Sequence, residues 1–239
     1  MRSEIDIIKG IWNDKDDEVY RRDVCHWRGH GRWADDARWL NIGKQTLQCI
    51  ERLGALAGRP GLHARSGLNV LEWGPGGGAN AFALRHLAAR YYGVDISAKN
   101  LAETERVVRE DGAADCFIPI ALDDAPASVA ARIEHPVSLF LSTAVFQHFP
   151  SHAYGFEVLA TLRRVCADDA LGFIQIRFDN GNEKYRSIQG LDEYERKHIT
   201  ANAYAIDAFW DAIAKAGFTP LAVTDIATSH NYATFYMQC

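Results

Sequence analysis

NVLEWGPGGGANAFALRHLAAR, residues 69–90, carries the strongest structural signal in the chain. A short apolar run, Val70–Leu71, predicts a strand, and four glycines follow within five residues, at Gly74, Gly76, Gly77 and Gly78. A helical pattern comes next, with Leu84, Leu87 and Ala88 on one side. Strand, glycine turn and helix is how an α/β protein brings its backbone close to a nucleotide, because glycine permits positive φ and has no Cβ to block a ligand.

The composition indicates a soluble globular protein. With 239 residues, 48% hydrophobic and 24% charged, the chain can form one large domain or a domain with a cap. A net charge of −5 and the lack of a long basic run argue against nucleic acid as the main partner. The charged first ten residues and the lack of a long apolar run argue against a signal peptide and a membrane span. Five scattered cysteines without a C-x-x-C pair favour a reducing, cytoplasmic location.

Strand and helix patterns alternate along the rest of the chain. We predict further strands at residues 91–94, 117–122, 137–146, 171–178, 220–226 and 232–237, and helices at 35–57, 97–110, 127–133, 151–165 and 206–216. Asp168 and Asp169 mark a predicted turn, and the polar triplet 229–231 predicts a closing antiparallel hairpin. The fold class is therefore α/β: a Rossmann-like, doubly wound, seven-stranded sheet, mostly parallel, with an antiparallel C-terminal hairpin.

Two segments fall outside this alternation. Residues 1–34 are rich in aromatic, histidine and charged side chains without a clean period, and we interpret them as a helical, aromatic cap over a site. An N-terminal arm packed on the outside is the alternative. Residues 179–203 are polar and predict a lid excursion from the main domain, which we assign to residues 35–239.

Acidic and polar residues follow the predicted strands at the edge where α/β proteins bind ligands. These strand exits carry residues 72–78, 142–148 and 177–180, together with Asp95 and the pair Asp123–Asp124. Asp95 lies 17 residues beyond Gly78, where a carboxylate can accept hydrogen bonds from both ribose hydroxyls of an adenosine cofactor. Capping of the next turn is the alternative role for this aspartate.

The glycine turn is compatible with two classes of cofactor. Gly74, Gly76 and Ala79 satisfy G-x-G-x-x-A, a variant of the dinucleotide fingerprint that would suit NAD. Glu72 favours a different cofactor, because a carboxylate there is well placed for a cationic amino-acid group and poorly placed for a pyrophosphate. The chain also offers no obvious second domain for a hydride acceptor.

The sequence resembles the class I S-adenosylmethionine-dependent methyltransferases of small-molecule type over residues 69–239. EWGPGGG at 72–78 followed by GVDIS at 93–97 is similar to motif I and the second-strand acid of that family, and STAVFQHFPS at 142–151 resembles its fourth-strand exit. The fourth strand departs from the family pattern, because many relatives begin it with Asp where this chain has Ser138. The resemblance implies S-adenosylmethionine as the cofactor.

The resemblance also implies roles for individual residues. For the methionine end of the cofactor it implies Glu72, Gly74, Gly76 and Gly78. It implies Asp95 for the ribose and Ile96 for the adenine face. It implies Asp123, and after it Asp124, for the adenine amino group, and Ser142 for the methyl-transfer end.

His148 is the candidate catalytic residue, because a histidine with a pKa near neutrality can take a proton from a hydroxyl or an ammonium. Its alternatives are a hydrogen bond to the loop leading to Pro150, and catalysis by alignment alone. Substrate contacts are predicted at His26, His30, Gln147, Asp179 and Asn180. The spacing of His26 and His30 would suit a metal on a helix, but the neighbouring glycines disfavour a helix, so we expect no metal.

The predicted function is transfer of a methyl group from S-adenosylmethionine to an oxygen or nitrogen of a small polar molecule. The acidic balance favours a polar or cationic acceptor, such as a sugar or amino sugar of a biosynthetic pathway. An NAD-dependent oxidoreductase and a non-catalytic cofactor-binding scaffold are the alternatives. We expect a small-molecule partner, no nucleic acid and no membrane, and we make no prediction of oligomeric state.

Overall fold

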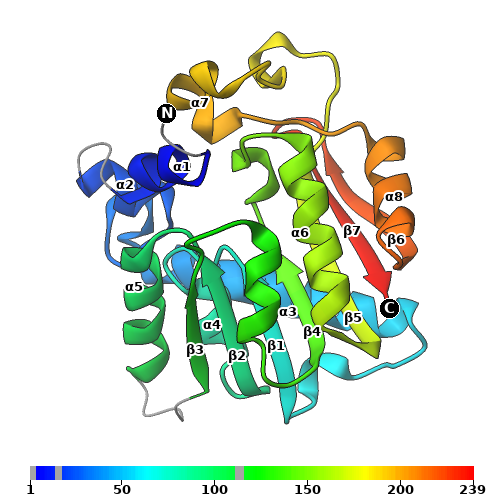
Figure 1. Cartoon of the computed structure of the whole chain (residues 1–239). Helices are drawn as coiled ribbons and strands as arrows, with labels where there is room; N and C mark the ends of the chain where they lie inside the picture. The colour runs from blue at the N-terminus through cyan, green and yellow to red at the C-terminus, as the bar shows by residue number, and fades with distance from the viewer. Residues whose placement is uncertain (1–3, 14–17, 111–115) are drawn as a thin grey trace.

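One seven-stranded sheet organises the protein, for which the computed structural model describes residues 4–13, 18–110 and 116–239. The strand order is β3-β2-β1-β4-β5-β7-β6 (Figure 1). β1 to β5 are parallel, and β7 runs antiparallel between β5 and β6. This confirms the predicted doubly wound sheet with a closing antiparallel hairpin. The strands are β1 Leu68–Trp73, β2 Ala88–Asp95, β3 Phe117–Ala121, β4 Val137–Ser142, β5 Cys166–Arg177, β6 Thr219–Ala227 and β7 Tyr232–Gln238.

Helices fill the connections between the strands. The α-helices are α1 Glu4–Asn13, α2 Glu18–Val24, α3 Asp36–Leu56, α4 Ala79–Leu84, α5 Ala98–Arg109, α6 His152–Val165, α7 Leu191–Lys197 and α8 Ile206–Lys215. The 3₁₀ helices are η1 Gly31–Trp33, η2 Leu62–Ala64, η3 Pro126–Arg132, η4 Phe146–His148, η5 Glu183–Tyr185 and η6 His198–Thr200. Ser97 and Ser151 cap α5 and α6 as predicted, since their side chains accept from the backbone N–H of Asn100 and of Tyr154.

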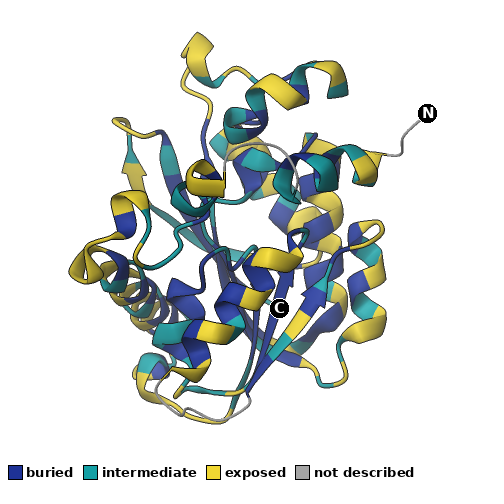
Figure 2. Ribbon diagram, turned by 90° about the vertical axis from the view of Figure 1, so that its left-hand side faces the viewer, coloured by how far each residue is buried: buried dark blue, intermediate teal, exposed yellow. Residues whose placement is uncertain are grey.

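Alternating side chains of each central strand pack on opposite faces of the sheet. Leu71 and Phe140 pack in one core with α6 and α8, whereas Val70 and Leu139 pack in a second core with α3, α4 and α5. Both layers are therefore apolar on the side that faces the sheet, and Figure 2 shows buried strands between helices whose outer sides are exposed. Successive side chains of a strand point to opposite faces of the sheet. Because both faces are covered here, the central strands read as near-continuous apolar runs.

Three local predictions are corrected by the structure. The helix after the glycine turn ends at Leu84, and Ala88 begins β2 rather than continuing the helix. Asp168 and Asp169 lie within β5, where the pairing with β4 shifts register, and do not form a separate turn. The helix predicted near residues 127–133 is the 3₁₀ helix η3.

α1, α2 and α7 gather at one end of the sheet in Figure 1. Trp12 of α1 donates its indole N–H to the hydroxyl of Tyr194 in α7 (3.1 Å), so the N-terminal segment and the 179–203 excursion meet there. Residues 1–3 and 14–17 of the predicted cap lie outside the described residues. None of the helices within the described ranges is long and apolar enough to cross a bilayer.

Candidate functional site

A cavity of about 760 Å³ lies at the carboxyl ends of the central strands. Its walls come from the glycine turn after β1, the end of β2, the loop after β4, the ends of β5 and β7, and the segment that precedes α3. This volume is in the range of natural small-molecule sites and can hold a nucleoside together with a small acceptor. The strand order reverses between β1 and β4, so the cavity sits at the switch point where α/β proteins bind ligands.

The glycine turn forms the floor of one half of the cavity and is also where the N-terminal segment docks. Gly77 donates its N–H to the carbonyl of Cys25 (2.6 Å). A Cβ added to Gly76 would lie 2.8 Å from that same carbonyl oxygen, and one added to Gly77 would lie 2.3 Å from the carbonyl oxygen of His26. The bare backbone of the turn therefore accommodates the segment around residues 24–27 as well as exposing Gly74 and Gly76 to the cavity.

Gly77→Ala tests this docking, because Gly77 does not need a positive φ and the backbone of His26 and Trp27 is what opposes a methyl group there. We expect a loss of about 1–3 kcal/mol of unfolding free energy and faster proteolysis of the N-terminal segment. Gly10→Ala in α1 is the matched control, since nothing lies within 4 Å of a Cβ there. Equal protease resistance of the Gly77→Ala variant and the wild type would contradict the docking.

Glu72, at the end of β1, is fully buried against the cavity wall. Its two carboxylate oxygens accept hydrogen bonds from Asn80 (2.7 Å) and from the hydroxyl of Tyr91 (2.6 Å). Thr46 of α3 in turn donates to Asn80 (2.7 Å). Burial raises the pKa of Glu72 to about 7, against the opposing effect of its two hydrogen-bond donors. The site therefore holds a carboxylate that gains from a nearby positive charge.

Asp95, at the end of β2, is held by the start of α5. One oxygen accepts from the backbone N–H of Ser97 (2.8 Å) and the other from the side chain of Asn100 (3.3 Å). Burial raises the pKa of Asp95 to about 6. Backbone hydrogen bonds from Gly76 and Ile96 also act on this carboxylate, which lines the cavity.

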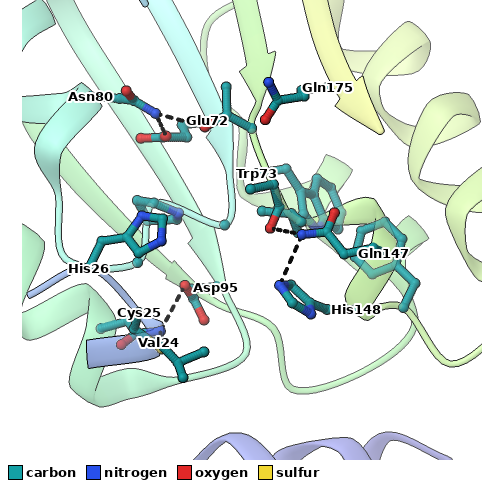
Figure 3. Close-up of a pocket in the computed structure, with 18 of the residues that line it drawn as sticks. Val24, Cys25, His26, Glu72, Trp73, Asn80, Asp95, Gln147, His148 and Gln175 are labelled. Carbon is teal, nitrogen blue, oxygen red and sulfur yellow. Dashed lines mark hydrogen bonds between the residues drawn. The ribbon is translucent and has the colours of Figure 1, made fainter. Parts of the chain in front are cut away.

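This half of the cavity fits an adenosine nucleoside that carries a cationic amino-acid tail. Asp95 offers a carboxylate of fixed orientation for ribose hydroxyls, and Glu72 offers a buried carboxylate that a cation would stabilise. Figure 3 shows Asp95, His26 and the Glu72–Asn80 pair on one side of the view and Gln147 with His148 on the other. We name these two sides the cofactor half and the acceptor half, after the roles that the sequence predicts for their residues.

His148 lies in the acceptor half, on η4 after β4. Its Nδ1 lies 3.0 Å from the carbonyl oxygen of His198, so Nδ1 carries the proton and donates. Nε2 then carries the lone pair. It lies 3.2 Å from Gln147 Nε2, whose two hydrogens face three acceptors: this nitrogen, Tyr232 and Ala144. The indole of Trp12 packs edge-on against the imidazole at 5.1 Å. Burial lowers the pKa of His148 to about 4, so the ring is neutral near pH 7.

A hydrogen-bonded cluster continues from His148 to the ends of β5 and β7. The hydroxyl oxygen of Tyr232 accepts from Gln147 Nε2 (3.2 Å) and from Arg177 (3.1 Å). Gln147 also donates to the carbonyl of Ala144 (2.7 Å), which fixes the orientation of its amide, since the flipped amide would place its oxygen against that carbonyl oxygen. Oε1 of Gln147 and Nε of Arg177 are buried without a hydrogen-bond partner within the described ranges.

The structure brings together most of the residues predicted for the site. Those that line the cavity are His26, Glu72, Gly74, Gly76, Asp95, Ile96, Gln147 and His148. Those that lie outside its lining are His30, Gly78, Asp123, Asp124, Ser142, Asp179 and Asn180.

Local packing explains the positions outside the lining that the resemblance had assigned to the cofactor. Gly78 begins α4 and packs against α5, where an added Cβ would lie 2.8 Å from Thr104. Ser142 is fully buried and donates to the carbonyl of Trp73 (2.9 Å), so it ties β4 to β1. Asp123 is exposed on the rim and pairs with Lys9 of α1. Asp124 is also exposed and accepts from the backbone N–H of Ala125.

The remaining three positions serve the local fold. The rings of His30 and Trp27 pack edge to face, with centroids 6.2 Å apart. Asp179 accepts from the backbone N–H of Gly181 (2.8 Å), and Asn180 donates to Asn231 (3.1 Å), so both take part in local hydrogen bonds. Substrate contact by these three residues stays a prediction, and the cavity lining does not include them.

Several cavity residues carry no motif and were not predicted. They are Trp12, Thr46, Asn80, Asn100, Gln175 and Tyr232. Gln175 had a usable signal, because Phe173, Gln175 and Arg177 alternate on one face of an otherwise apolar strand. A glutamine and an arginine on a buried strand face indicate a cavity, since such side chains otherwise lack partners.

Comparisons with known proteins agree with this geometry. Residues 71–174 match a family described as methyltransferase domain. A magnesium protoporphyrin IX methyltransferase from Synechocystis PCC 6803 with bound SAM superposes with a TM-score of 0.65 at 16% identity, covering 100% of this chain and 98% of that chain. N-methyltransferase NodS from Bradyrhizobium japonicum WM9, in complex with S-adenosyl-L-homocysteine, gives 0.59 at 10% identity, covering 82% and 86%.

The fold is also shared with a protein of a different reaction. The [4+2]-cyclase SpnF gives a TM-score of 0.57 at 12% identity, covering 80% of each chain. At these sequence identities the structural likeness shows the fold alone. The reaction has to be inferred from the residues of the site. Comparison with curated proteins found no match.

Proposed function

We propose that the protein is a class I S-adenosylmethionine-dependent methyltransferase, with residues 71–174 as the core of its methyltransferase domain, and that it methylates an oxygen or nitrogen of a small polar molecule. S-Adenosylmethionine supplies, when bound, an activated methyl group on a sulfonium whose leaving group is neutral. The observation that carries the proposal is the division of one cavity into a carboxylate-lined cofactor half and an acceptor half with free polar atoms.

Cofactor binding is assigned to Glu72 and Asp95, with Gly74 and Gly76 as the backbone floor and Ile96 beside them. Glu72 faces the position of a cationic amino group, and Asp95 faces that of the ribose hydroxyls. The segment 24–26 also lines the cavity and docks on the glycine turn of this half, and Trp12 packs on His148 in the other half. Alignment of donor and acceptor in a dry cavity supplies much of the rate enhancement for a substitution at a good leaving group.

His148 is proposed to receive the proton that the acceptor loses. The neutral ring, with its proton on Nδ1 and the lone pair on Nε2, supports this assignment. A pKa of about 4 makes the ring a weak base, so we expect only about tenfold to hundredfold loss of kcat in His148→Ala. The acid limb of the pH–kcat profile is expected near pH 4 and is expected to be missing in the variant. A change of kcat below threefold with an unaltered profile would instead assign His148 to packing.

A labelled-methyl assay tests the function as a whole. The protein is incubated with methyl-deuterated S-adenosylmethionine and a panel of small hydroxy and amino compounds, and products are analysed by mass. We expect a labelled product in which the methyl group is on oxygen or nitrogen, with one S-adenosylhomocysteine formed per product. Tight cofactor binding without S-adenosylhomocysteine formation on any compound would favour the scaffold alternative. The sugar or amino sugar suggested by the acidic composition belongs in the same panel.

A further inference from the structure

We propose that the acceptor half of the cavity recognises a carboxylate. Arg177 binds the acid group of the methyl acceptor, and Gln147 accepts a hydrogen bond from a hydroxyl or amine of the same molecule. The substrate class is then a small hydroxy acid or amino acid. The inference rests on the proposed methyl transfer for its biological meaning, and the binding site itself can be tested separately.

Arg177 is a buried cation without a counter-ion. It is 8% exposed, lines the cavity, and forms no ion pair with a carboxylate in the part of the chain that the structure describes. Within the described ranges its side chain donates one hydrogen bond, to the neutral hydroxyl of Tyr232, and its Nε has no partner. The guanidinium carbon lies 4.4 Å from the centroid of Tyr185 and 5.1 Å from that of Tyr232.

An unpaired buried charge is costly, because its hydration is lost without a compensating partner. Cation–π contacts with Tyr185 and Tyr232 offset part of this cost and hold the guanidinium in place. A planar guanidinium presents parallel donors that match the two oxygens of a carboxylate. A bound acid would therefore supply the charge that this site lacks.

The charge count of the cavity favours a monoanion. Two arginines line it, and Arg32 is already paired with Asp23 (2.9 Å), so Arg177 carries the one uncompensated positive charge of the described lining. Glu72 and Asp95 place two carboxylates in the cofactor half. A phosphate dianion would be under-compensated by Arg177 and repelled by these acids, whereas a carboxylate matches a single charge.

Gln147 adds a second specificity element next to the cation. Both side chains donate to the same Tyr232 oxygen, at 3.2 and 3.1 Å, so they lie side by side. The unpartnered atom of Gln147 is its carbonyl oxygen, which requires a donor, while the unpartnered atom of Arg177 requires an acceptor. A molecule with a carboxylate close to a hydroxyl or amine satisfies both.

The strand order places Arg177 away from the glycine turn, where the methionine carboxylate of S-adenosylmethionine is expected to lie. The glycine turn follows β1, whereas Arg177 ends β5, and β4 lies between them. Two strand spacings amount to roughly 10 Å across the sheet. Arg177 thus stands over the acceptor half, beside His148 and Gln147.

Matched probes that differ only in the acid group test the inference. 4-Hydroxybenzoate and 4-hydroxybenzamide, and glycine and glycinamide, are titrated into the full chain with and without S-adenosylhomocysteine. The readouts are affinity by calorimetry and the ¹⁵Nε–H resonance of Arg177, assigned from its absence in Arg177→Lys. Arg177→Met removes the charge, and Arg164→Met, at an exposed position of α6, is the matched control.

We expect at least one acid to bind about tenfold or more tightly than its amide and to move the Arg177 resonance. Arg177→Met is expected to abolish this preference without changing S-adenosylhomocysteine affinity, and Arg164→Met to keep both. Three results overturn the inference: no acid binds better than its amide, the preference survives in Arg177→Met, or that variant loses S-adenosylhomocysteine affinity. If the wild type fails to bind S-adenosylhomocysteine, the proposed function fails, and the titration of the cofactor-free chain still decides the role of Arg177.

Discussion

Asp95→Ala is expected to weaken S-adenosylhomocysteine binding by at least about a hundredfold. Two ribose hydroxyls donating to one buried carboxylate form charge-assisted hydrogen bonds worth roughly 1.5–3 kcal/mol each. Their joint loss corresponds to about two to four powers of ten in Kd. This is the largest effect on binding that we predict for a single side chain.

The fold is expected to survive this substitution. Removal of Asp95 leaves the N–H of Ser97 and the amide of Asn100 without their acceptor, at a cost of about 1–3 kcal/mol for each group. The same change also removes a carboxylate whose pKa burial raises to about 6, so it relieves an unfavourable buried charge. These opposite effects offset one another in large part.

Calorimetry with S-adenosylhomocysteine measures the effect, and circular dichroism checks the fold. Asp211→Ala removes a carboxylate from the exposed side of α8 and is expected to leave affinity unchanged. An Asp95→Ala variant that binds within threefold of the wild type would remove Asp95 from the cofactor site.

Glu72→Gln is expected to make the cofactor-free protein more stable at pH 8 by roughly 2–3 kcal/mol, with little change at pH 4.5. Burial raises the pKa of Glu72 from 4.5 to about 7 in the folded state. A raised pKa means that the folded state holds the proton more tightly than the unfolded chain. The stability that Glu72 contributes is thus fully present below about pH 4.5 and is lost as pH rises through about 7.

The size of the effect follows from the shift of the pKa. A difference of about 2.5 units corresponds to roughly 3 kcal/mol, at about 1.4 kcal/mol per unit. Glutamine keeps the shape of glutamate and carries no charge, and the hydroxyl of Tyr91 can turn to accept from the new amide. The same variant is expected to lose cofactor affinity, because the cationic amino group loses its carboxylate.

Denaturant unfolding of the wild type and the variant between pH 4.5 and 8 measures this difference. The raised pKa of Asp95 acts in the same direction in both proteins and cancels in the comparison. Glu51→Gln on the exposed side of α3 serves as a control and is expected to show no such trend. A stability difference between Glu72→Gln and wild type that does not change with pH would show that folding does not raise the pKa of Glu72.

The sheet could be predicted from the sequence because its signals are local. Apolar runs of strand length, Ser97 and Ser151 at helix starts, and the glycine turn each depend on a few neighbouring residues. The positions of Glu72 and Asp95 in the cavity lining could be predicted for the same reason, since both sit at strand ends. Their cofactor role stays a prediction. The short α4 was harder, because Leu87 and Ala88 continue the helical period although β2 begins at Ala88.

The acceptor half could not be predicted in detail because its contacts join residues far apart in the chain. Tyr232 meets Gln147 across 85 positions, and Trp12 meets Tyr194 across 182. Aspartates after strands were also over-assigned. Asp123 and Asp179 look like Asp95 in sequence, but they turn to the rim or to a local turn, and no local pattern separates the three.

Titration of the wild-type chain with S-adenosylhomocysteine, followed by calorimetry, decides whether the cavity is a site for S-adenosylmethionine. We expect saturable binding of one nucleoside per chain, lost in Asp95→Ala, with no heat from reduced nicotinamide dinucleotide under the same conditions. Absence of binding by S-adenosylhomocysteine, or saturable binding of the nicotinamide cofactor in its place, would contradict this expectation.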